Sequence, residues 1–237
     1  MSIFKIRNRK EVFAWSIYDF ANQPFTTIIV TFIYSAFFVK VIAPNEQEGT
    51  FLWSNAIAIT AIVVSLLSPI LGALADKGGY RKFFLITSTW ICAIFSILLY
   101  FPNVGDIYFA LSCFVIANIA FEMGSVFCNS YLPDLSSTDN IGRISGYAWG
   151  LGFVGGLLAL FLSLFLFDIN NPDEIRKINI LVGIWFLLFS IPTFLFVKDR
   201  KKEKLNKEHI HSAFQSVKET FRSIKNYREI SRFLIAR

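Results

Sequence analysis

Two carboxylates lie within apolar stretches of this 237-residue chain, where an ionised group is costly to bury. Asp19 and Glu122 each stand inside a run of apolar residues long enough to cross a bilayer. A charged side chain at mid-membrane costs about 2.5–3.5 kcal/mol on insertion scales, so such residues usually mark a solute pathway or a proton relay. We expect both carboxylates to face a water-accessible cavity, and Glu122 in particular to accept a proton. Two buried carboxylates satisfied by neighbouring helices, with no functional role, would give the same pattern.

Further polar side chains flank each carboxylate at helical spacing. In the first run the separation is three residues, and in the other it is four and seven. Residues three, four or seven positions apart share one face of an α-helix. The two runs therefore predict two helices that each carry a polar stripe and line a common cavity. The residues concerned are Tyr18, Asp19 and Asn22 in one helix and Asn118, Glu122 and Asn129 in the other.

The elements that must position these side chains are membrane-spanning helices. Apolar residues make up 54% of the chain, and the mean hydropathy is +0.53. About 20 consecutive apolar residues suffice for a spanning helix, and the chain offers six such runs. We expect an all-α membrane protein with six transmembrane helices, the first of them tilted or kinked near Pro24 because proline interrupts a helix. The spans are expected near 12–40, 52–75, 83–101, 107–132, 145–167 and 179–197.

Basic residues set the expected orientation of these spans. The N-terminal segment 1–10 is basic and passes directly into the first span without a signal-peptide cleavage site. Lys and Arg gather there, in the loops after the second and fourth spans, and after the sixth. Cytoplasmic loops are the ones enriched in these residues. The N-terminus is thus expected in the cytoplasm, in a multi-pass protein of a bacterial inner membrane or an equivalent membrane. The net charge of +6 then needs no nucleic-acid partner.

Composition divides the chain into three parts. Residues 1–197 hold the six spans, and residues 198–231 form a basic cytoplasmic linker. The linker has one apolar stripe at spacings of four and three, which predicts an amphipathic helix docked on the inner membrane face or under the helix bundle, although a passive tether also fits. The stripe consists of Ile210, Phe214, Val217, Phe221 and Ile224. Residues 232–237 resemble the start of a truncated seventh span.

Residues that could hold a metal or catalyse a reaction are sparse. Cys92, Cys113 and Cys128 all fall inside spans and form no CxxC pair, which is typical of small packing residues. His209 and His211 stand alone in the charged linker, where solvated side chains are expected. There is no His/Asp/Ser grouping, no metal-ligand spacing and no nucleotide-binding loop. We therefore expect neither an enzyme nor a bound cofactor or metal.

The fifth span is rich in glycine. A G-x-x-x-G spacing lets two helices approach closely, because no Cβ stands at the contact. Such smooth faces also allow helices to slide or rock against one another. The glycines expected at helix contacts are Gly146, Gly150, Gly155 and Gly156.

The loop between the second and third spans carries a recognisable motif. Glycine at position 79 permits a tight turn, Asp76 can cap a helix N-terminus, and two basic residues at the loop's end anchor it on the cytoplasmic side. The loop resembles the major facilitator superfamily signature G-x-x-x-D-[RK]-x-G-x-[RK]-[RK], with every defined position filled and in the expected place. The matching residues are Gly72, Asp76, Lys77, Gly79, Arg81 and Lys82.

Three further stretches resemble one branch of that superfamily, the vacuolar-effluxer-like family. Its fungal members are linked to autophagy and export amino acids from the vacuole. Residues 15–22 resemble the W-x-x-Y-D-x-A-N signature of this branch. Residues 126–134 resemble its V-F-Y-N-x-x-L-P stretch, with Cys128 in place of Tyr. Residues 145–156 resemble its S-G-x-G-x-x-x-G-Y-x-G-G stretch, with Ala148 in place of Gly, Trp149 in place of an aliphatic residue and Phe153 in place of Tyr.

This resemblance implies a transporter of two six-helix halves, of which the chain is the N-terminal one. The first and fourth helices would line the cavity, the third and sixth would face lipid, and the second and fifth would meet the other half. Asp76 and Arg81 would form a latch that holds the halves together and opens during alternating access. The implied partners are a small-molecule substrate such as an amino acid, a proton, membrane lipid, and the C-terminal six-helix half or a second copy. A non-transporting scaffold or an inactive transporter fragment is the alternative.

Overall fold

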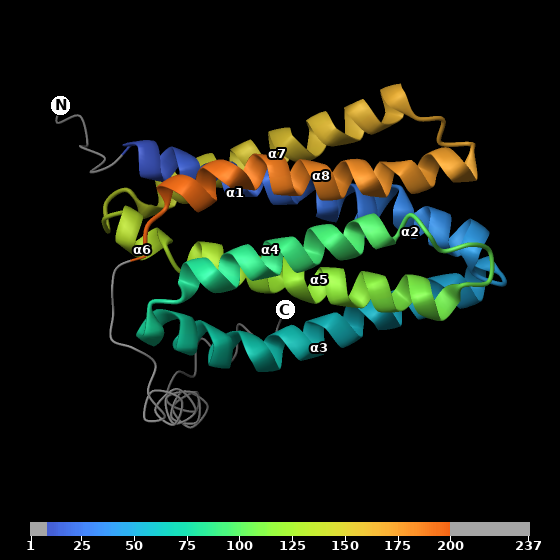
Figure 1. Ribbon diagram of the computed structural model, residues 1–237, viewed down its shortest axis with the longest axis horizontal. Helices are drawn as coiled ribbons and strands as arrows, with labels where there is room; N and C mark the ends of the chain where they lie inside the picture. The colour runs from blue at the N-terminus through green and yellow to red at the C-terminus, as the bar shows by residue number, and fades with distance from the viewer. Residues whose placement is uncertain (1–8, 200–237) are drawn as a thin grey trace.

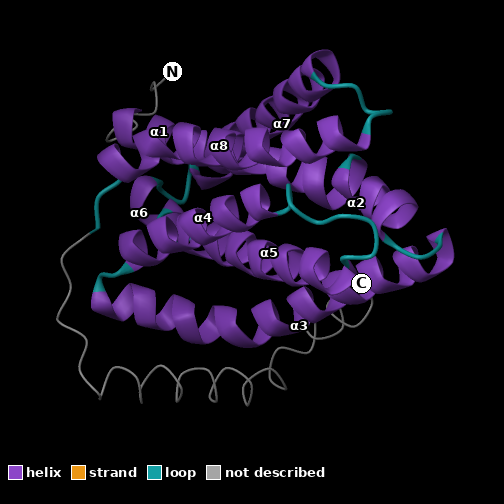
Figure 2. Cartoon of the chain, turned by 45° about the vertical axis from the view of Figure 1, so that its right-hand side comes forward, coloured by secondary structure: helices purple, strands orange, loops and turns teal. Residues whose placement is uncertain are grey.

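A computed structural model describes the backbone of residues 9–199 and, apart from residues 73, 74 and 76–78, their side chains. Six helices in that part are long and apolar enough to cross a membrane, as the sequence predicts, and no strand occurs among the described residues (Figure 2). The spans are Arg9–Ile42, Glu46–Gly72, Arg81–Leu98, Ile107–Leu135, Ile141–Leu166 and Pro172–Phe196. The amphipathic helix and seventh span expected between residues 210 and 237 lie outside the described residues.

Figure 1 labels the α-helices of these spans. The first span comprises α1 (Arg9–Pro24), the π-helical segments η1 (Phe25–Phe32) and η2 (Phe38–Ile42), and the short α2 (Tyr34–Phe37) between them. The other spans are α3 (Glu46–Gly78), α4 (Arg81–Leu98), α5 (Ile107–Asn129), α7 (Ile141–Leu166) and α8 (Pro172–Phe196), and α6 (Leu132–Leu135) is a single turn after α5. We name the two ends of the bundle after their short helices. The α6 end holds the α3–α4 turn, and the α2 end holds the α7–α8 loop.

Pro24 ends the regular part of the first span. Proline has no N–H, so the carbonyl of Phe20, four residues earlier, loses its helical partner. The indole N–H of Trp185 in α8 donates to that carbonyl at 3.2 Å. The helix α7 also passes close to it, because a Cβ at Gly155 would collide with the same oxygen. The kink expected near Pro24 is thus a change from α-helix to π-helix that two neighbouring helices support.

The six spans form two layers of three helices (Figure 1). One layer contains α1, α7 and α8, and the other contains α3, α4 and α5. The helix α8 packs along α4 and joins the two layers, while α1 and α5 are in contact over only a small area. The first three spans (α1, α3 and α4) correspond in order to the last three (α5, α7 and α8). Each helix neighbour has a counterpart under this correspondence: α1–α7 matches α5–α3, and α1–α8 matches α5–α4. Corresponding spans run in opposite directions across the bundle. The bundle is therefore an inverted repeat of two three-helix units in which α1 and α5 are equivalent.

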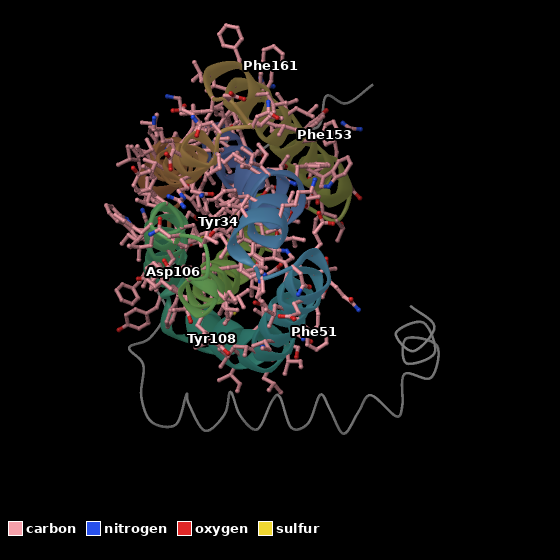
Figure 3. All side chains as sticks on the ribbon, turned by 90° about the vertical axis from the view of Figure 1, so that its right-hand side faces the viewer. Tyr34, Phe51, Asp106, Tyr108, Phe153 and Phe161 are labelled. Carbon is pink, nitrogen blue, oxygen red and sulfur yellow. The ribbon has the colours of Figure 1, made fainter. Side chains whose placement is uncertain are left out.

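The helices α3 and α7 are the most exposed of the six. Only 11% of the most apolar stretch of α3 and 28% of that of α7 is buried, against 39% to 50% for the other spans. Phe51 on α3, and Phe153 and Phe161 on α7, point away from the bundle, whereas Tyr34 points into its centre (Figure 3). Apolar faces of this size need lipid or another protein surface to cover them.

Candidate functional site

Tyr18 lies in the core of the bundle and not on a cavity wall. Its side chain is fully buried, and its ring packs on Phe186 of α8. The hydroxyl lies 2.9 Å from Oγ1 of Thr89 in α4. Thr89 donates its own hydrogen to the carbonyl of Leu85, so Tyr18 is the donor in this pair. A Cβ at Gly124 of α5 would lie only 2.6 Å from the same hydroxyl. The expectation that Tyr18 lines a cavity is therefore corrected: it ties α1 to α4 and α5.

The seam between α1 and α5 is tied at two further levels. Trp15 donates its indole N–H to the carbonyl of Cys128 at 2.7 Å, and Phe25 stacks on Phe121 with 5.1 Å between ring centroids. Asn22 precedes Phe25 by three residues and is only 4% exposed. Its amide therefore lies within the bundle and not on the wall of an open cavity.

Asp19 is half-buried where α1 meets α7. A Cβ at Gly152 of α7 would lie 3.1 Å from that of Asp19, so the absence of a side chain there makes room for the carboxylate. Gln23 and Thr27 lie against the next turn of α7, and Thr26 is part-exposed beside them. These polar residues extend the stripe of Asp19 along α1 and into η1. The sequence prediction missed them, although their spacing of four, seven and eight residues from Asp19 signals one helical face.

Glu122 lies on the open face of α5. Glu122 and Asn129 are both exposed, and the part-buried Ser125 lies between them. Asn118, by contrast, is 6% exposed and lies within the bundle. A carboxylate on a spanning helix faces hydrocarbon only at a large cost. The face of α5 that carries Glu122 must therefore be covered by water or by protein other than the described residues. Asp19 and Glu122 belong to different layers of the bundle.

Arg81 is buried at the α6 end and binds within this bundle. It donates from Nη1 to the carbonyl of Ser130 at 2.8 Å and from Nη2 to the carboxylate of Asp134 at 2.9 Å. Its guanidinium also lies over the ring of Tyr131, 4.9 Å from the centroid. A buried guanidinium needs such partners because an unpaired charge there is costly. Asp134 of the same six-helix unit is thus one charge partner of Arg81, and the latch between Arg81 and Asp76 stays a prediction, because the side chain of Asp76 lies outside the described part.

Lys82 and Asp199 hold the segment after α8 against the α3–α4 turn. The backbone N–H of Lys82 donates to the carboxylate of Asp199 at 3.0 Å, and its ammonium donates to the carbonyl of Val197 at 3.1 Å. Tyr131 donates its hydroxyl to Asp199 at 2.5 Å. Asp199 therefore caps the N-terminus of α4, where Tyr80 offers no side-chain cap. The sequence prediction missed Asp199, because its partners lie 117 and 68 residues away and no local pattern joins them.

The remaining motif residues lie at the end of α3. Gly79 has φ of 68°, which is the left-handed conformation that ends the helix in a tight turn. At Gly72 the nearest described atom to a Cβ would be 4.0 Å away, so none of the described residues requires glycine there. Asp76 and Lys77 lie in the last turn of α3, and their side chains are outside the described part. The capping role expected of Asp76 therefore stays a prediction.

The glycines of α7 divide into two groups. Gly155 and Gly156 contact the first span, since a Cβ at Gly155 would strike Phe20 of α1 and a Cβ at Gly156 would strike Thr27 of η1. Gly146 and Gly150 have no described atom within 4 Å of a Cβ, so they make no helix contact inside this bundle. Close packing at Gly146 and Gly150 stays a prediction about a surface that faces outward.

Metal-binding side chains are scattered through the described residues. No group of three or more His, Cys, Asp or Glu within residues 9–199 could hold a metal ion. Cys92, Cys113 and Cys128 are buried and carry free thiols.

Comparison with known proteins adds to this geometry. A family model described as Major Facilitator Superfamily matches residues 20–236. An uncharacterized MFS-type transporter from Bacillus subtilis, YxiO, is 24% identical over 242 residues, which cover 97% of this chain and 56% of YxiO. The multi-drug resistance efflux pump PmrA of Streptococcus pneumoniae is 26% identical over 216 residues, which cover 87% of this chain and 48% of the pump. Autophagy-related protein 22 of Coccidioides immitis is 22% identical over 197 residues, which cover 60% of this chain and 33% of that protein. The chain thus spans about half the length of YxiO and PmrA.

Proposed function

This chain belongs to the Major Facilitator Superfamily, and from that membership we propose that it is half of a secondary transporter of small solutes. The observation that carries the proposal is Glu122, a carboxylate on the exposed face of a membrane-spanning helix. Such a residue is tolerated where the helix lines a polar pathway. In alternating access, two helix bundles rock about a site near the middle of the membrane and open it to one side and then to the other.

The second bundle is proposed to cover the faces of α3 and α7. These helices are the most exposed ones, and α7 presents Gly146 and Gly150 on an open surface. Small residues on a helix face let a partner helix approach closely. The partner is the C-terminal six-helix half of a twelve-span carrier, or else a second copy of this chain. The cavity would lie between the two bundles, with Asp19 and Gln23 of α1 and Glu122 of α5 on its wall.

The proposed substrate is an amino acid. The stretch around Asp19 resembles the vacuolar-effluxer-like branch, and similarity to autophagy-related protein 22 over part of the chain supports that branch. A carboxylate binds the ammonium group of an amino acid through charge-assisted hydrogen bonds. Glu122 is also the proposed carrier of a coupling proton, with Asp19 as the second candidate, because intramembrane carboxylates commonly relay protons.

The α6 end of the bundle is proposed to face the cytoplasm of a bacterial cell. Arg9, Lys10, Arg81, Lys82 and Arg143 all lie near this end. Basic residues close to the ends of spans are retained on the cytoplasmic side. This orientation supports the proposed place of residues 198–231 as a cytoplasmic linker between the two halves.

Flux into proteoliposomes tests this function. The complete carrier is reconstituted with its partner half and given radiolabelled amino acids, with and without an imposed proton gradient. We expect saturable flux that the gradient accelerates, and Glu122→Gln should abolish the gradient-driven part. Glu46→Gln, which alters an exposed carboxylate at the start of α3, is the matched control and should change nothing.

Each failure of this experiment has a distinct meaning. Absence of amino-acid flux while other solutes move would refute the substrate. Proton-driven flux that survives Glu122→Gln would refute the role of that carboxylate. Absence of flux for every solute would favour the alternative of a non-transporting scaffold.

A further inference from the structure

A groove of about 490 Å³ opens between α7 and α8, which barely touch each other. Leu162 of α7 and Phe167, which directly follows α7, form one wall, and apolar side chains between positions 180 and 189 form the other wall on α8. Trp185 on that wall stacks on Phe20 of α1, with 5.3 Å between ring centroids, so its indole is held between the groove and α1. The groove is an apolar slot, separate from the polar stripe that begins at Asp19.

Lys177 is the charged residue of the groove lining and lies at the α2 end. Its side chain is 48% exposed, and its ammonium pairs with Glu174 at 2.5 Å. An ammonium has three N–H donors, so two are left for a further ligand. Residues 168–177 carry three carboxylates against two basic side chains, and this balance disfavours a ligand with net negative charge. A head group with both a phosphate and a primary ammonium matches the Lys177–Glu174 pair, because each charge meets its opposite and the ammonium N–H groups can donate to the carboxylate, which the quaternary nitrogen of choline cannot do.

The length of the groove fits one leaflet of a bilayer. Lys177 and Phe189, at its two ends, are twelve residues apart, which is about 18 Å along an α-helix. Half of the hydrocarbon core of a bilayer is about 15 Å thick. The groove therefore runs from the interface, where lysine side chains place their charge, to about the middle of the membrane. That is the path of a single acyl chain.

The inverted repeat supplies an internal comparison. The equivalent groove, between α3 and α4 over α5, has a volume of about 420 Å³ and is lined by residues such as Leu67, Phe84 and Met123. None of the described residues that line it is charged. A lipid chain can fill such a groove, but these described side chains offer no charge that would select a head group.

From the length, shape and charge of the α7–α8 groove, we propose that it binds one acyl chain of a phospholipid with an ethanolamine head group. The phosphate binds Lys177 and the ammonium binds Glu174, while the chain lies along Trp185 toward Phe189. This site lies outside the transport pathway and does not depend on the identity of the transported solute.

Quenching of Trp185 fluorescence by brominated lipids tests the site. Trp90 and Trp149, which are exposed, are replaced by Phe, and the buried Trp15 and Trp53 remain as a constant background. The full chain is reconstituted in bilayers of digalactosyl diacylglycerol, whose head group is neutral. Phosphatidylethanolamine with brominated chains is added in one series, and digalactosyl diacylglycerol with the same brominated chains in the other. Bromine quenches an indole on contact, so the mole fraction at half-maximal quenching reports occupancy of the groove.

Brominated phosphatidylethanolamine should reach half-maximal quenching at a mole fraction several times lower than the brominated galactolipid. Lys177→Gln should bring the two curves together. Arg176→Gln removes the same charge from a side chain that pairs with Asp173 and does not line the groove, so it should keep them apart. Coincident curves for the parent chain, a preference that survives Lys177→Gln, or tighter binding of brominated phosphatidylglycerol would each overturn the proposal.

Discussion

A methyl group added at Gly155 would strike the backbone of α1. The new Cβ would lie 2.9 Å from Cα and 3.0 Å from the carbonyl carbon of Phe20, whereas carbon atoms in contact are normally about 3.5–4.0 Å apart. Backbone atoms cannot rotate away, so α7 would have to move, and the Trp185 hydrogen bond to the same carbonyl would be strained. Overpacking of this kind costs about 1–3 kcal/mol, and a lost hydrogen bond adds about 0.5–1.5 kcal/mol. Alanine regains about 1 kcal/mol of helix propensity. We expect Gly155→Ala to lower the free energy of unfolding by about 1–3 kcal/mol.

The measurement is reversible unfolding of the purified chain in mixed micelles, titrated with dodecyl sulfate and followed by circular dichroism. Gly150→Ala is the matched control, since nothing described lies within 4 Å of its Cβ. It should be neutral or stabilising by up to about 1 kcal/mol, because alanine is the better helix former. Equal stability of the two variants would refute the reasoning, since it would mean that α1 and α7 are not in contact at Gly155.

Four further substitutions probe other contacts. Arg81→Ala should lower the free energy of unfolding by about 3 kcal/mol in the same titration. This is the low end of the range for breaking a buried ion pair, because Asp134 is part-exposed. A loss below about 1 kcal/mol is typical of a surface ion pair and would contradict a buried one. Asp199→Ala should speed amide hydrogen exchange in the first turn of α4 and cost about 0.5–2 kcal/mol, whereas Asp199→Asn should keep most of the cap; equal exchange in both variants would argue against capping. Tyr18→Phe should lower the free energy of unfolding by about 0.5–1.5 kcal/mol, because one hydrogen bond is lost, and should leave substrate affinity unchanged. A weaker substrate affinity would indicate that Tyr18 lines the cavity after all. Gly150→Ala should reduce flux through the complete carrier without destabilising the isolated chain, and full flux would contradict a partner face on α7.

The six spans were predictable from the sequence because the signal is local. A run of apolar residues long enough to cross the bilayer has few alternatives to a spanning helix. The break at Pro24 was predictable for the same reason, since the missing N–H is a property of the residue itself. Its support by Trp185 was not, because α8 reaches Phe20 only through the packing of distant spans.

The candidate site was less predictable, because helical spacing identifies a face but not the neighbour that the face meets. Tyr18 and Asp19 are adjacent in the chain, yet one lies in the core and the other beside α7. The sequence predicts helix contacts for all the glycines of α7 alike. Only tertiary packing distinguishes Gly155, which contacts α1, from Gly150, which does not. Asp199 shows the same limit, since its hydrogen bonds join segments that no sequence window contains.

The proposed transport function depends on whether Glu122 borders an aqueous cavity in the complete carrier. The direct measurement is the rate at which Glu122→Cys reacts with a charged, membrane-impermeant thiol reagent in intact membranes, where the three native cysteines are buried. Ile94 lies on the exposed face of α4. The rate for Ile94→Cys therefore serves as the reference for a position in contact with lipid. An aqueous cavity predicts that Glu122→Cys reacts many times faster than Ile94→Cys, and that substrate slows the reaction. Equal, slow rates for both variants would contradict the central claim.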